Sequence, residues 1–118
     1  MIKLTGLNGD SILVGAGSIF RLRATAAFEG ADANKVEYGG GYIFTREAIG
    51  SLIDRIGDDG KFIELTTRSG KPVFINANAV SRIREALAIN GPGTEIVVGG
   101  QYQHVVEDLE TVVRLLSD

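Results

Sequence analysis

The chain opens with MIKLTGLNGDSILVGAGSIFRLRA (residues 1–24), and residues 62–85 repeat this pattern as FIELTTRSGKPVFINANAVSRIRE. The two stretches align without a gap and are identical at seven of 24 positions. Residues 35–56 then align with residues 95–116 after a register change of one residue, with four of 22 positions identical. Unrelated segments of ordinary composition share far less. We therefore interpret the chain as a tandem duplication, in which features present in both copies belong to the fold.

Each copy is predicted to begin with a β-hairpin. Apolar residues alternate with polar ones at the start of both copies, as in a half-buried strand. LNGD (residues 7–10) and RSGK (residues 68–71) are typical of turns in which Gly supplies a positive φ. A short apolar run follows each turn. The next three residues are Gly-Ala-Gly in one copy and Asn-Ala-Asn in the other, which predicts a sharp turn with left-handed backbone.

A third strand, a second hairpin and a helix are predicted to complete each copy. Alternating residues place the third strand over Leu22, Ala24, Ala26 and Phe28, and over Ile83, Glu85, Leu87 and Ile89. Loops at residues 29–34 and 90–93 lead to hairpins that turn at paired glycines. The helices are amphipathic, with the inward faces Ala48, Ile49, Leu52, Ile53 and Ile56, and Leu109, Val112, Val113 and Leu116.

The termini of these helices differ. The sequence predicts Thr45 as the N-cap of the first helix. Val105 stands at that place in the second copy, where the acidic residues Glu107, Asp108 and Glu110 suit the helix dipole instead.

These elements predict an α+β fold of two repeated small antiparallel β-sheet or barrel units, each with a C-terminal helix, packed as a pseudo-dimer. We place the first repeat at residues 1–57, a linker at residues 58–61 and the second repeat at residues 62–118. A unit of this length has only a small core of its own, so the two units should gain stability by packing together.

The unit resembles the small flagellar FlbD/SwrD-type proteins. The resemblance rests on MIKLTGLNG, the apolar strand after it, the G-G-x-Y hairpin and the IGSLIDRI-type helix of the first copy. In the second copy it rests on FIELTTRSGKPVFINANAVSRI, GTEIVVGGQY and VEDLETVVRLL. It implies a role connected with motility and no catalytic residues. That family has one copy per chain, whereas this chain has two.

A second resemblance is to LytTR-type DNA-binding modules. The pattern N-x-x-x-V-x-x-I is present as Asn76, Val80 and Ile83, and a strand–turn–strand and a helix follow it. The resemblance implies nucleic-acid binding, although the basic reading loops of those modules are missing here.

Composition excludes several classes of function. The chain has no cysteine, which removes disulfides and thiolate metal sites, and its net charge of −3 is not that of a general nucleic-acid binder. No apolar run approaches the length that spans a membrane, and the N-terminal residues lack a signal-peptide core. We therefore expect a cytoplasmic protein with no membrane contact.

No arrangement of residues predicts catalysis, a cofactor or a metal site. The single histidine, His104, aligns with Phe44 and is interpreted as a partly buried ring in a strand. The acidic pairs Asp58-Asp59 and Glu107-Asp108 are interpreted as solvated charge in the linker and at a helix start. The glycine clusters are interpreted as turns, because the third glycine and the helix of a dinucleotide loop are absent.

Two arginine pairs are the candidate binding residues. Arg21 and Arg23 align with Arg82 and Arg84, although their neighbours differ between the copies. Members of each pair lie two apart and project from one face of a strand, where guanidinium groups suit phosphate or carboxylate. The alternative is that they form cross-strand ion pairs, for instance with Glu37, Glu64 or Glu95.

The sequence thus predicts a non-enzymatic protein-binding or assembly module, built as a fused pseudo-dimer, that docks another protein at exposed strand edges. Further homo-oligomerisation is compatible with this reading. The alternative is nucleic-acid or phospholigand binding through a surface of the four arginines.

Overall fold

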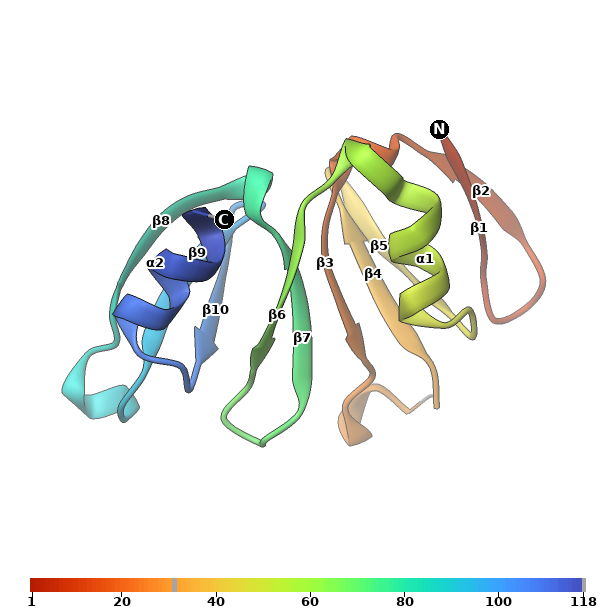
Figure 1. Ribbon diagram of the computed structural model, residues 1–118. Coiled ribbons are helices and arrows are strands. Elements are labelled where there is room, and N and C mark those ends of the chain that lie inside the picture. The colour runs from red at the N-terminus through yellow and green to blue at the C-terminus, as the bar shows by residue number, and fades with distance from the viewer. Residues whose placement is uncertain (31, 118) are drawn as a thin grey trace.

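The predicted hairpins are present in both halves of the chain (Figure 1). Strand β1 (Ile2–Thr5) pairs antiparallel with β2 (Ser11–Val14), and β6 (Phe62–Thr66) pairs in the same way with β7 (Pro72–Asn76). Their turns contain Gly9 and Gly70 with φ of 88° and 82°, a conformation that costs glycine little.

The computed structural model describes residues 1–30 and 32–117. Ala31, in the first predicted loop, and Asp118, at the end of the second predicted repeat, lie outside the described residues.

Each hairpin is followed by three further strands and a helix, in the same order in both halves. In the first half these are β3 (Ile19–Ala24), β4 (Asn34–Tyr38), β5 (Gly41–Thr45) and α1 (Ile49–Ile56). In the second half they are β8 (Val80–Glu85), β9 (Thr94–Val98), β10 (Gln101–Val105) and α2 (Leu109–Ser117).

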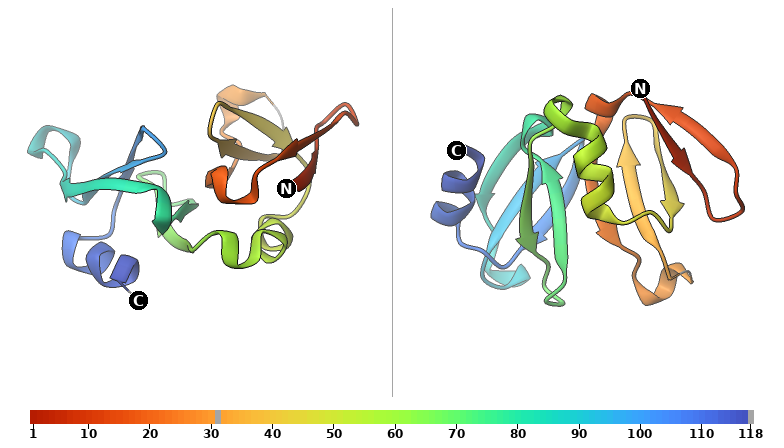
Figure 2. Two further views of the ribbon diagram at one scale, coloured as in Figure 1. Left: turned by 90° about the horizontal axis from the view of Figure 1, so that it is seen from above. Right: turned by 45° about the vertical axis from the view of Figure 1, so that its right-hand side comes forward.

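The division of the strands into sheets does not coincide with the division of the chain into two halves. Among the described residues, β1-β2 form one sheet, β10-β9-β8 a second, and β5-β4-β3-β7-β6 a five-stranded third. The hairpin of the second half therefore extends the sheet of the first half through an antiparallel β3–β7 pair (Figures 1 and 2). All the pairs are antiparallel, so the predicted α+β class is confirmed.

Two hydrophobic clusters form the core, one in each half. Leu4 and Leu65, which align in the sequence, are both fully buried, the first in one cluster and the second in the other. Each cluster also receives side chains from the other half. Phe62 and Phe74 pack against the first cluster, and Phe20 belongs to the second. The two halves therefore share their apolar contacts across the β3–β7 junction.

The first helix packs as its pattern predicts from Ile49 onward, whereas the inward placement of Ala48 was wrong, because Ala48 is exposed and precedes the helix. Leu52 and Ile56 are buried, and Ile49 and Ile53 pack against the same cluster. The predicted N-cap was wrong, because Thr45 is the last residue of β5 and Ala48 precedes the helix without a side-chain cap.

The second helix departs from its predicted face at Val113, while Val112 and Leu116 pack against the core as predicted. Val112 is fully buried, whereas Val113 is 45% exposed, so its inward placement was wrong. Leu115, one turn on from Val112, contacts the core instead. Asp108 caps this helix by accepting a hydrogen bond of 2.8 Å from the Thr111 amide.

Two local predictions in the strands were also wrong. The third strands end at Ala24 and Glu85, not at Phe28 and Ile89, because β4 and β9 provide no partner beyond those points. Phe28 is 87% exposed as a result. The Gly-Ala-Gly and Asn-Ala-Asn segments form turns, but none of their residues has a positive φ. Asn76 acts through its side chain, which accepts a hydrogen bond from the Asn78 amide.

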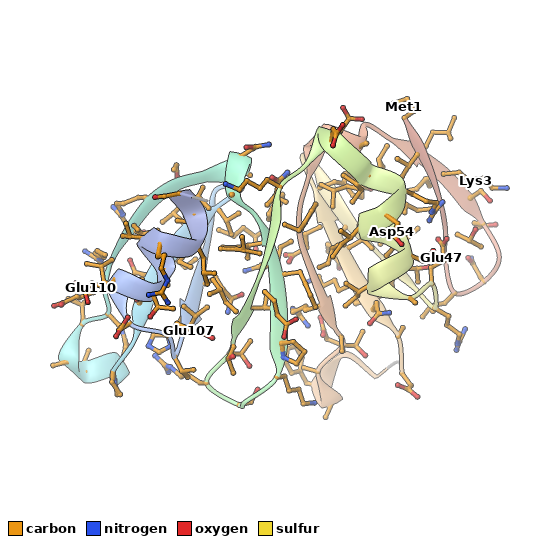
Figure 3. All side chains as sticks on the ribbon, in the orientation of Figure 1. Met1, Lys3, Glu47, Asp54, Glu107 and Glu110 are labelled. Atoms are coloured by element: carbon orange, nitrogen blue, oxygen red, sulfur yellow. The ribbon has the colours of Figure 1, made fainter. Side chains whose placement is uncertain are left out.

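An aligned glutamate ties the hairpin to the helix in each half (Figure 3). Glu47 accepts a hydrogen bond of 3.2 Å from the Thr5 amide, and Glu107 accepts one of 2.9 Å from the Thr66 amide. Because both contacts join the end of the first strand to the start of the helix, they account for the identity of this residue in the two halves.

Candidate functional site

Arg21 is buried at the junction between the two halves. Its Nε and Nη2 donate to the carboxylate of Glu37 on β4, the Nη2 bond measuring 2.7 Å. Nη2 also donates to Gln101, while Nη1 donates to the side chain of Gln103 and to the carbonyl of Tyr102, all on β10. These bonds use all five N–H donors of the guanidinium. Arg21 therefore holds β10 of the second half against the sheet of the first.

Arg23 forms a second, separate ion pair. Its Nη1 and Nη2 donate to the two carboxylate oxygens of Glu29 at 2.8 and 3.0 Å. Glu29 also accepts a bond of 2.7 Å from the Ala26 amide and lies 3.6 Å from the Lys35 ammonium. Two-pronged pairs of this kind are among the stronger charge-assisted contacts.

We expect the contacts of Glu29 to make the free energy of unfolding depend on pH in the acidic range. The hydrogen bond from Arg23, helped by the Ala26 amide and the nearby Lys35, lowers the pKa of Glu29 from 4.5 to about 2. Because the folded pKa lies below the unfolded one, the stabilisation is complete above about pH 4.5 and is lost as the pH falls towards 2. Urea titrations between pH 6 and pH 2 should show Glu29→Gln with a flatter dependence than the parent protein. Parallel curves for the two proteins would contradict this.

Arg82 and Arg84 share one carboxylate on the neighbouring strand. Arg84 donates to Glu95 at 2.9 and 3.3 Å, and Arg82 donates to the same group at 3.5 Å. Their side chains are 52% and 46% exposed, compared with 8% for Arg21. Exposed pairs of this kind contribute only about 0.2–1 kcal/mol.

The fold divides the four arginines between two sheets. Arg21 and Arg23 lie on β3, inside the five-stranded sheet, whereas Arg82 and Arg84 lie on β8, at an edge of the three-stranded sheet. The cross-strand partners are Glu37 and Glu95, two of those expected from the sequence. The side chains of Arg21 and Arg23 are only 8% and 20% exposed. Arg82 and Arg84 therefore present most of the guanidinium surface of this set to solvent.

Three other residues considered for catalysis or metal binding are packed in the sheet or make contacts that stabilise the fold. His104 lies on β10 opposite Glu95, and both its ring nitrogens are buried without a hydrogen-bond partner among the described residues. Glu107 accepts a hydrogen bond from the Thr66 amide, and Asp108 caps α2. Bonds from Thr111, through its side chain and then its amide, lower the pKa of Asp108. Residues 1–30 and 32–117 contain no group of three His, Asp or Glu placed to hold a metal ion.

Six strands lie at a sheet edge in the described residues, namely β1, β2, β5, β6, β8 and β10. Two of them, β2 and β8, have counterparts in the other half that are paired on both sides, and the sequence pattern did not locate this feature. In the described residues β2 pairs with β1 alone, and β8 pairs with β9 alone. Leu13, in the middle of β2, is 66% exposed. The corresponding strands β7 and β3 cover each other inside the chain. The alignment contained a signal: Phe20, Phe62 and Phe74 of the internal junction align with Ser81, Met1 and Leu13.

Comparisons with known proteins find no matching family model, no matching curated protein and no matching solved structure. In the part of the chain that the structure describes, neither helix is long and apolar enough to cross a membrane.

Proposed function

We propose that the chain is a non-enzymatic assembly module, a fused pseudo-dimer of a duplicated unit that binds protein by strand addition. The observation that carries this proposal is the open edge of β2, with the apolar side chain of Leu13 66% exposed at its centre. An open edge presents a row of unpaired N–H and C=O groups, which an extended strand of another chain can satisfy.

The internal β3–β7 pair supports the proposal, because it shows how this architecture uses such an edge. There a hairpin from one half adds to the sheet of the other and brings Phe74 against Leu22. A partner at β2 would likewise supply backbone pairing and cover Leu13. The occurrence of the same series of elements in both halves is the basis for regarding them as copies of one unit.

Photo-crosslinking in the native cells tests this function. A photoreactive residue at position 13 should give one or a few defined protein adducts. The same residue at position 28 is the matched control, because Phe28 is apolar and 87% exposed but lies outside the strands. Equal adducts from both positions, or none from position 13, would contradict strand addition at β2. Adducts with nucleic acid that disappear at high salt would instead favour the arginine surface.

A further inference from the structure

The internal junction is a complete interface between two hairpin-and-sheet units. Strand β3 pairs with β7 in the register Arg21–Ile75, Leu22–Phe74 and Arg23–Val73. The junction buries Leu22 completely and Phe20 to 5% exposure. The Phe20 ring lies against Gly99, where any Cβ would overlap it. Backbone pairing, apolar contact and the Arg21 bonds to β10 thus act together at this one interface.

The second half has a strand in the position of β3, but no strand pairs with its outer edge. This strand is β8, and its outer edge is unpaired although α2 contacts β8. The first four residues of β3 are all buried, whereas no residue of β8 is. Ile83, which aligns with the fully buried Leu22, is only partly buried. This difference in burial is the one that a missing neighbour at β8 produces.

The first half presents the complementary surface. Strand β2 occupies the place of β7, and its outer edge is also free. Three residues of β7 are buried, namely Val73, Ile75 and Asn76. In β2 only Val14 is buried. Met1 and Leu13 are 82% and 66% exposed, while the aligned Phe62 and Phe74 pack against the first core cluster.

The backbone groups at the two free edges match. The Gly6 amide donates to the Asp10 carbonyl, so alternation along the β1–β2 pair turns the N–H and C=O of Leu13 away from β1. The Ala86 amide donates to the Gly93 carbonyl, and the same alternation turns those of Ile83 away from β9. Phe74 and Leu22, which pair inside the chain, have the corresponding orientation. Leu13 and Ile83 can therefore form the same kind of pair.

We propose that a second copy of this chain occupies these edges, β8 of one molecule pairing antiparallel with β2 of the next. The register is that of the internal junction: Ile83 opposite Leu13, Arg82 opposite Val14 and Arg84 opposite Ile12. This deepens the proposed function, on which it rests, by naming the partner. Strand β2 and strand β8 lie at opposite ends of the molecule (Figure 1), whose longest extent is 43 Å, so one chain cannot join them. The contact is head-to-tail, and repetition gives a ring or a filament.

The side chains indicate a contact weaker than the internal one. Ser81 stands where Phe20 fills the internal junction, and it would face Gly39 of the neighbouring molecule without filling that space. Arg82 keeps the position of Arg21 and would reach the Tyr42 carbonyl, the counterpart of the Tyr102 carbonyl that Arg21 binds. Association should therefore be reversible and depend on concentration.

Sedimentation of the full chain tests the association. The parent protein should form larger species as its concentration rises. Leu13→Lys should weaken association at least about tenfold, because it sets a charge against the apolar Ile83 of the neighbour. Phe28→Lys is the control and should associate like the parent. A parent protein that remains monomeric at every concentration, or a Leu13→Lys variant that associates normally, would overturn the proposal.

Cysteine crosslinking tests the direction and register, and the absence of native cysteine makes it clean. Leu13→Cys mixed with Ile83→Cys should give a disulfide-linked pair, since directly opposed residues lie about 5.5 Å apart. Ser11→Cys mixed with Ile83→Cys should not, because it is displaced by two residues along the strand. Self-crosslinking of Leu13→Cys at the same rate as the mixture would overturn head-to-tail pairing. If the chain stays monomeric and the photoreactive residue at position 13 crosslinks to a different protein, self-association is wrong and the proposed function still holds.

Discussion

Leu52→Ala is expected to lower the free energy of unfolding by about 2–5 kcal/mol, because it removes a large side chain from a packed interior. Leu52 is fully buried in the first core cluster, on the face of α1 that covers the β1–β2 hairpin and the neighbouring strands. The cost combines the lost burial of the side chain with the cavity that remains. Urea or thermal denaturation followed by circular dichroism measures it directly.

Val113→Ala provides the control for this prediction. Val113 lies one position after Val112, the residue that aligns with Leu52, but it is 45% exposed. Its truncation should change stability by no more than about 0.5 kcal/mol. Equal shifts for the two variants would mean that α1 does not pack as the structure shows.

Local pattern was sufficient to predict most individual elements. The hairpin turns at Gly9 and Gly70 follow from residues a few positions apart, and so does the inward face of α1. In these segments the period of apolar residues and the turn chemistry point to the same structure. The pattern failed where it continued past the end of an element, as at Phe28, because alternation does not show where the partner strand stops.

The arrangement of the sheets required information that local pattern lacks. The β3–β7 pair joins Leu22 to Phe74, two residues far apart in the sequence, and either strand could satisfy a period-two pattern without the other. The differences between the aligned residues of the two halves carried the missing signal. Phe20 and Phe74 are large where Ser81 and Leu13 are smaller, since the first two lie in a covered junction.

The same reasoning explains the partial prediction of the arginine site. The strand positions of the four arginines and two of their carboxylate partners could be predicted from the sequence, because cross-strand neighbours in a meander are close in the chain. The contacts of Arg21 with Gln101 and Gln103 could not, since they depend on the junction between the halves. Identical residues at aligned positions thus have different roles: one arginine is a buried tie between sheets, and its counterpart is half exposed.

Arg21→Met is expected to lower the free energy of unfolding by about 3–5 kcal/mol, the usual cost of removing one partner from a buried ion pair. Glu37 is 2% exposed and would lose its guanidinium, leaving the Lys35 ammonium at 4.0 Å as its remaining cation in the described residues. The bonds to β10 would be lost at the same time. Urea denaturation at neutral pH provides the measurement.

Two further variants separate the buried charge from the loss of side-chain packing. Arg82→Met changes the aligned residue on β8, where the ion pair is exposed, and should cost less than about 1 kcal/mol. Glu37 aligns with Val97, so Glu37→Val restores the apolar choice of the second half. Added to Arg21→Met, it should recover much of the lost stability, because no unpaired carboxylate remains. If Arg21→Met and Arg82→Met lower the free energy of unfolding equally, Arg21 is not the buried tie between the halves. If the double variant recovers no stability, the loss comes from the contacts with β10 and not from the unpaired carboxylate of Glu37.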